Sequence, residues 1–101
     1  MTTDDPDALT VVLSGPVTVY ESAEARETLL AALAVGKDVR VHLETSGPWD
    51  VAGVQLLLAT VASARKAGRT ARLTMVPGVC RDVAERSGLG DWLESATDSF
   101  A

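Results

Sequence analysis

The chain has 101 residues, which suits one domain with a single core and is too short for two ordinary cores. Hydrophobic residues make up 47% of the chain but aromatic residues only 4%, so Ala, Val and Leu must fill most of the core. The formal net charge of -5 argues against a nucleic-acid partner, because phosphates call for a basic protein face.

Cysteine usage and the N-terminal sequence bear on the compartment. Cys80 is the only cysteine, which excludes an intramolecular disulfide. The stretch "MTTDDPDA" lacks the basic start and the apolar run of a signal peptide, and no apolar run reaches membrane-spanning length. We therefore expect a cytoplasmic protein that does not insert directly into a membrane.

The first predicted elements are two strands, at residues 8–14 and 17–20. In "ALTVVLS" alternate side chains are apolar on one side, which is the period of a half-buried strand. Gly15 and Pro16 then turn the chain. The segment "VTVY" predicts a second, shorter strand.

A helix is expected next. Ser22 can cap a helix that runs to about Val35, where Gly36 would stop it. Its inward stripe is predicted to be Leu29, Leu30 and Leu33.

Two more strands follow, "DVRVHLE" at residues 38–44 and "ARLTM" at residues 71–75, both with alternating apolar side chains. The strongest helix signal lies between them. Asp50 is its predicted N-cap and Gly68 its C-terminal stop, with Arg65 and Lys66 in the last turn. Its apolar stripe is Val54, Leu57, Leu58 and Val61.

The C-terminal part predicts two shorter helices. One starts near Pro77 and Gly78 and is expected to bury Val79, Cys80, Val83 and Ala84. The other is expected to place Leu89, Trp92 and Leu93 against the core.

This order of elements predicts an α/β fold with parallel neighbouring strands joined by right-handed crossovers. The repeated polar positions of the strands predict a mostly parallel sheet of four to five strands, with helices packed mainly on one face. The expected domain covers residues 8–94, with a flexible N-terminus at 1–7 and a flexible tail at 95–101.

Catalytic chemistry has little support in the sequence. With one His and one Cys, the chain offers no arrangement that makes a triad. We interpret His42 as a solvated or hydrogen-bonded surface histidine and Cys80 as a buried, unreactive thiol. The chain has no G-x-x-x-x-G-K-S/T phosphate loop, and "SGLGDW" lacks the strand-to-helix context of a dinucleotide site. We therefore expect no catalytic residues and no cofactor.

A metal site has equally little support. Glu44 and Asp50 are the only carboxylates in the central loop region that suggest shared ligands. Two carboxylates six residues apart are better explained by helix capping and solvation. We expect no metal.

The stretch "SGPWDVAGVQ", residues 46–55, stands out as a candidate site. It leads from the carboxyl end of a strand to a helix N-terminus, where open α/β sheets usually build their sites. Bare N–H groups and Gly53 would let another chain's backbone or an anion approach; alternatively, Gly53 only lets the helix pack closely. Trp49 is expected to be exposed beside the loop, either as a hydrophobic lid on its own domain or as a partner anchor.

The sequence resembles the STAS domain over residues 8–94. The resemblance is carried by "LSG" at 13–15, "DVAGVQLLLA" at 50–59, the "A…G" helix end at 64–68 and "GL" at 88–89. STAS domains occur in anti-sigma factor antagonists, in the cytoplasmic tails of sulphate transporters and in the small subunit of bacterial lipid-transport ATPases. The resemblance implies the STAS fold.

The most specific motif of that family is D-S/T-x-G, which Asp50, Ala52 and Gly53 match in part. In signalling members the resemblance implies phosphorylation of the Ser or Thr by a partner kinase. Val51 stands there in this chain, so no phosphorylation site is expected at that position. A second departure is His42, where family members commonly carry Asp.

The resemblance implies a non-enzymatic protein-interaction module of bacterial signalling, like the anti-sigma factor antagonists. Its partner would be an anti-sigma kinase, a chemotaxis or histidine-kinase component, or a transporter ATPase. The alternatives are a STAS subunit that regulates a lipid-transport ABC ATPase, or a STAS domain that senses a small ligand or nucleotide. The predicted partner-binding residues are Ser46, Trp49, Asp50, Val51, Ala52, Gly53 and Gln55.

Overall fold

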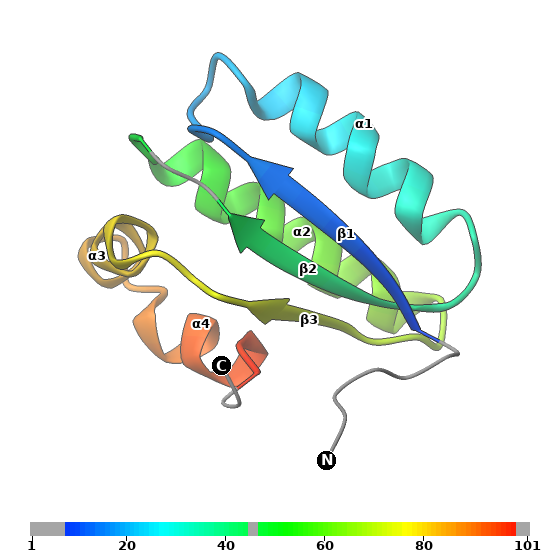
Figure 1. The fold of residues 1–101 in the computed structure, drawn as a ribbon. Coiled ribbons are helices and arrows are strands. Elements are labelled where there is room, and N and C mark those ends of the chain that lie inside the picture. Colours follow the sequence, from blue (N-terminus) through cyan, green and yellow to red (C-terminus); the bar gives the residue numbers. More distant parts are fainter. Residues whose placement is uncertain (1–7, 45–46, 99–101) are drawn as a thin grey trace.

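Figure 1 shows the computed structural model of the chain, which describes residues 8–44 and 47–98. Strands and helices alternate as far as α3, as the α/β prediction requires, and a further helix follows. The elements are β1 (Ala8–Ser14), α1 (Ser22–Leu33), β2 (Asp38–Glu44), α2 (Val51–Lys66), β3 (Ala71–Thr74), α3 (Gly78–Arg86) and α4 (Gly90–Ala96).

The strands form one parallel sheet in the order β1-β2-β3. Its register places Val11 beside Val41, and Val41 beside Leu73. The parallel neighbours are confirmed, but the predicted count of four to five strands is too high, since the sheet has three strands within the described residues.

The segment 17–20 forms a turn instead of the expected strand. Only Val17 makes a strand-like pair, with Trp49. Glu21 Oε1 accepts hydrogen bonds from the hydroxyl of Thr18 at 2.7 Å and from its backbone N–H at 2.8 Å. The hydroxyl bond first, and then the backbone bond, lower the pKa of the Glu21 carboxyl. Such local side-chain bonds compete with sheet pairing, and here they determine the conformation.

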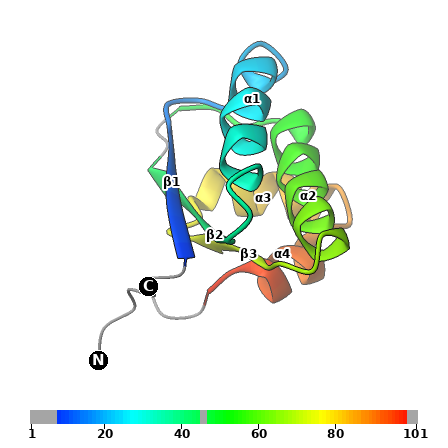
Figure 2. The ribbon, with the colours of Figure 1, turned by 90° about the vertical axis from the view of Figure 1, so that its right-hand side faces the viewer.

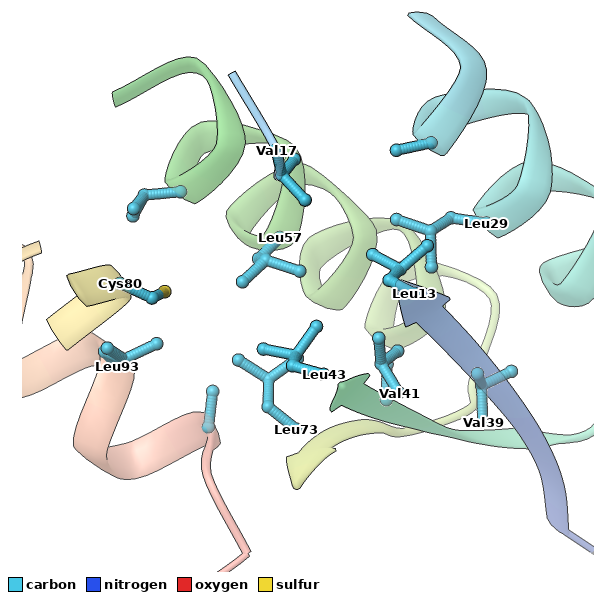
Figure 3. Close-up of a cluster of buried hydrophobic side chains, with 14 of the residues drawn as sticks. Leu13, Val17, Leu29, Val39, Val41, Leu43, Leu57, Leu73, Cys80 and Leu93 are labelled. Atoms are coloured by element: carbon cyan, nitrogen blue, oxygen red, sulfur yellow. The ribbon is translucent and has the colours of Figure 1, made fainter. Parts of the chain in front are cut away.

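Helices cover one face of the sheet, which confirms the predicted layers. In Figure 2 the sheet is seen nearly edge-on, with α1 and α2 on the same side of it. Figure 3 shows Leu13, Leu43 and Leu73 of the three strands meeting Leu57 of α2. All four are buried, so their apolar surface provides much of the stability of this layer.

Helix α1 is shifted from its expected start and stripe. Ser22 is its first residue and not its cap, because the Ser22 hydroxyl donates to Val19 O. The buried residues are Ala25, Leu29 and Ala32, at helical spacing. Leu30 is 44% exposed, so its predicted burial was wrong. The small alanines take the inward stripe because they let α1 approach the sheet closely.

Helix α3 carries the only cysteine. Cys80 is fully buried, as predicted, and burial raises the pKa of its thiol to about 11. The thiolate is therefore scarce at neutral pH, which fits an unreactive core residue. Val79 was expected to be buried beside it but is exposed at the start of α3.

The last described residues cover the outer edge of β3. Asp98 N–H donates to Leu73 O at 2.7 Å, and the Arg72 guanidinium donates to the carbonyl oxygens of Ser95 and Thr97. The fold thus extends beyond residue 94, although the tail was expected to begin at residue 95. The expected flexible segments 1–7 and 99–101 lie outside the described residues. Within residues 8–44 and 47–98, no helix has the length and apolar character needed to cross a membrane.

Candidate functional site

Two loops meet at the edge of the sheet where the parallel strands end (Figure 1). One follows β1 and the other follows β2, and they are joined by the Val17–Trp49 pair. Val17 N–H also donates to Pro48 O at 3.1 Å. Because both loops lie at carboxyl ends of parallel strands, this edge is the usual place for a site in an open α/β sheet.

Asp50 ties both loops to the start of α2. Its Oδ1 accepts from Ala52 N–H at 2.9 Å and from Gly53 N–H at 3.3 Å, which confirms it as the N-cap. Its Oδ2 accepts from Val19 N–H at 3.0 Å. The amides that we expected to be bare are thus occupied by the protein's own carboxylate, and the idea of an anion bound by them was wrong.

Gly53 has no side chain because its neighbours leave no room for one. A Cβ atom built on Gly53 would lie 2.5 Å from Val17 O and 2.8 Å from Trp49 Cε3. Contacts this short do not occur, so either the loop or the helix would have to move. Gly53 therefore allows α2 to pack closely against Val17 and Trp49, and it is buried and not accessible to a partner protein.

Trp49 is the lid over this packed corner. It is 5% exposed, and the edge of its ring faces the position where a Gly53 side chain would be. The expectation that Trp49 lies exposed beside the loop was wrong, because Pro48 and Val17 fold the ring onto its own domain. The lid interpretation is confirmed.

Other predicted site residues stay accessible. Val51 is 43% exposed at the first position of α2, and Gln55 is exposed one turn later on the same face of the helix. Ala52 is half-buried between this face and the cap. Ser46, together with Thr45, lies outside the described residues.

The structure adds four apolar residues that the sequence reasoning missed. Val19 and Tyr20 are exposed in the loop after β1, Tyr20 to 90%. Met75 and Val79 are exposed in the segment that follows β3. Together with Val51, they make five of the eight exposed large hydrophobic side chains in the described part of the chain, and all five follow the carboxyl ends of strands.

Met75 also has an unusual backbone. Its φ of 57° is in the left-handed region, which costs a side-chain-bearing residue roughly 1 kcal/mol. It is the only residue other than glycine with positive φ within residues 8–44 and 47–98. A strained residue beside exposed apolar neighbours is an arrangement found at functional sites.

His42 near this edge contacts a hydroxyl group and a carboxylate. His42 Nδ1 lies 3.1 Å from Thr74 Oγ1, and His42 Nε2 lies 3.4 Å from Glu44 Oε2. His42 is thus a hydrogen-bonded, part-exposed histidine on the open sheet face, as interpreted from the sequence. Across the ranges that the structure describes, no three His, Cys, Asp or Glu side chains gather as metal ligands.

Comparisons with known proteins fit this architecture. The family model described as "Mlab, STAS domain" matches residues 1–95. The crystal structure of a sulfate transporter family protein from Wolinella succinogenes is similar, with a TM-score of 0.65 and 18% identity. The match covers 93% of this chain and 86% of that chain, and at this identity it concerns the fold alone. A comparison with curated proteins gives no significant match.

Proposed function

Because the chain belongs to the STAS domain family, we propose that it is a non-enzymatic protein-interaction module of the cytoplasm. The partner binds the exposed side chains at the carboxyl edge of the sheet. We call this surface the docking edge. It consists of Val19, Tyr20, Val51, Gln55, Met75 and Val79.

The observation that carries the proposal is that exposed apolar side chains follow the carboxyl ends of all three strands, which lie at one edge of the parallel sheet. Single exposed hydrophobic residues are ordinary, whereas a group of them marks an interaction surface. An aromatic residue at its rim, Tyr20, is of the type that contributes most at protein interfaces.

The remaining predicted site residues support this surface from beneath. Asp50 fixes the loop after β1 to the start of α2, and Trp49 and Gly53 hold the two loops together by packing. A surface built on such fixed loops loses little conformational entropy when a partner binds. These three residues therefore shape the docking edge and do not contact the partner.

The proposed interaction is not regulated by phosphorylation at the family's usual position, which is residue 51 in this chain. Val51 has no hydroxyl group to accept phosphate, and its side chain is presented to solvent at the helix start. The same position that switches binding off in signalling relatives here supplies an apolar contact. Phosphorylation of residue 51 therefore cannot switch this interaction off.

Two partner classes follow from the family, a signalling kinase and a transporter ATPase. Of the two, we propose the ATPase of a lipid transporter, which the resemblance of the sequence to the small subunit of lipid-transport ATPases implies. An anti-sigma or chemotaxis kinase is the alternative partner.

A matched pair of variants tests the docking edge. Val51→Asp and Leu30→Asp each place a carboxylate at an equally exposed apolar helix position, 43% and 44% exposed. Leu30 lies in the second half of α1, away from the docking edge. Each tagged variant is purified from its native cell, and the co-purified proteins are measured by quantitative mass spectrometry.

We expect Val51→Asp to lose a kinase or an ATPase that the wild type and Leu30→Asp retain. The loss should be about tenfold or more, because the variant forfeits the burial of the 43% of Val51 that is exposed and must also bring a carboxylate into a partly dehydrated contact. Equal retention of the partner by Val51→Asp and wild type would contradict the proposal.

A further inference from the structure

A second surface lies at the other end of α2. A groove of about 840 Å³ runs between the second half of α2, the start of β3 and α4. Figure 2 shows the C-terminal end of α2 and α4 on the same side of the molecule. We call this surface the basic groove. Its lining includes Leu58, Val61, Arg65, Lys66, Arg69, Arg72 and Trp92.

The charge of the basic groove is opposite to that of the chain. Four of the nine Lys and Arg residues line it, and its lining includes no Asp or Glu. The chain as a whole has a formal net charge of -5. A cluster of this kind is therefore not a consequence of a generally basic surface.

Internal ion pairs do not account for these cations. The ion pairs within residues 8–44 and 47–98 are His42–Glu44 and Arg81–Glu94, and neither involves the groove. Arg72 is held in place by the carbonyl oxygens of Ser95 and Thr97. The other three cations have no carboxylate of the described residues within 4.0 Å.

The helix dipole explains only part of the cluster. Arg65 and Lys66 are in the last turn of α2, where cations interact favourably with the dipole. Arg72 lies beyond the end of the helix, and its guanidinium is accounted for by its bonds to the carbonyl oxygens of Ser95 and Thr97. Arg69 also lies beyond the helix, and neither the dipole nor a carboxylate of the described residues accounts for its charge.

The floor of the groove is apolar. Leu58 and Val61 of α2 and Trp92 of α4 are each only partly buried, so part of their surface remains in contact with water. Ala59 and Ala62 of α2 also line the groove, and their small, exposed side chains leave the apolar floor accessible. An apolar floor with a basic rim fits a ligand that has one apolar side and one acidic side.

We propose that the basic groove binds an acidic amphipathic helix of a protein partner. A helix carries an apolar stripe and a charged face side by side, and an apolar groove takes such a stripe. The negative charge of the chain disfavours nucleic acid, and a concave groove is a poor shape for lying on a flat lipid surface. The cations of this groove lie apart from Val51 of the docking edge, because Arg65 follows Val51 by 14 residues of α2, about 21 Å at 1.5 Å per residue.

Three synthetic helical peptides test the proposal. They share one leucine face and carry Glu, Gln or Lys on the other face. Each is titrated into the full-length isotope-labelled protein, and binding is followed through the amide resonances of Ala62, Arg69 and Trp92. Phosphatidylglycerol vesicles and single-stranded DNA are titrated in parallel.

The control is a matched charge reversal. The double variant Arg65→Glu/Lys66→Glu is compared with Arg26→Glu/Lys37→Glu, in which both changed residues are exposed and lie outside the groove. Circular dichroism melts of both variants establish that they are folded. Arg72 is left unchanged because its hydrogen bonds support α4.

We expect only the Glu peptide to bind tightly. The groove variant should bind it at least about tenfold more weakly, since two attractions become repulsions, while the control variant should bind it like the wild type. Val51→Asp should bind it normally, which separates this proposal from the docking edge. Equal binding of the Glu and Lys peptides, unchanged affinity of the groove variant, or binding of vesicles or DNA in place of the peptide would each overturn the proposal.

Discussion

The two ends of α2 differ in what they present to solvent. At the N-terminal end Asp50 accepts from the backbone N–H groups of Ala52 and Gly53, and the side chains of the docking edge carry no charge. At the C-terminal end cations surround a partly exposed apolar floor. One helix thus separates an uncharged surface from a charged one, and ionic strength should affect binding only at the second.

The difference also shows how each end is held. The start of α2 is fixed by a carboxylate and by a glycine that allows the loops to pack against it. The end of α2 is closed by Gly68, whose φ of 76° allows Arg69 N–H to donate to Ala64 O at 2.8 Å. The N-terminal end of α2 therefore depends on close packing against the loop after β1, whereas the C-terminal end is closed by a hydrogen bond to its own last turns.

Of the variants at the N-terminal end of α2, Gly53→Ala should lower the stability of the fold most. The added methyl group would meet the backbone oxygen of Val17, which cannot move without its loop. We expect a loss of about 1–3 kcal/mol in the free energy of unfolding, although alanine favours helices. Urea denaturation of the wild type and the variant measures it.

Gly78→Ala is the matched control, because Gly78 also lies at the start of a helix and has no heavy atom within 4 Å of the added Cβ. Its stability should rise or stay within about 1 kcal/mol of the wild type. If the two variants were equally stable, packing would not be the reason for Gly53.

Asp50→Ala should have the next largest effect. It removes the helix cap and the bond to Val19 N–H, at a cost of about 1–2 kcal/mol. Asp50→Asn can keep the cap through Oδ1 but cannot accept from Val19 with its amide nitrogen, so its loss should be smaller. Amide hydrogen exchange should be faster at Val19 in both variants, and unchanged protection there would contradict the role of Asp50 as a tie between the loops.

The sequence predicted the regular part of the fold well. The periods of residues 8–14, 38–44 and 50–66 identified β1, β2 and α2, because in these segments the hydrophobic pattern and the local signals agree. The STAS resemblance is confirmed by the match over residues 1–95.

The failures lie where particular side-chain contacts, one local and the others distant in sequence, decide the structure. The "VTVY" pattern gave no sign that Glu21 would bind Thr18 and bend the segment into a turn. Trp49 and Gly53 could each be interpreted in two ways, because their contact with Val17 joins two loops. Tyr20 was missed as a site residue since an apolar side chain in an expected strand indicates burial.

The most direct test of the central claim is site-specific photo-crosslinking in the native cell. A photoreactive phenylalanine derivative replaces Tyr20 on the docking edge or, in a separate protein, Leu30 on α1, and cross-linked proteins are identified by mass spectrometry. We expect a covalent adduct with one kinase or ATPase from position 20 and none with that protein from position 30. An adduct with that protein from position 30 alone would contradict the docking edge, because it would place the interface on α1.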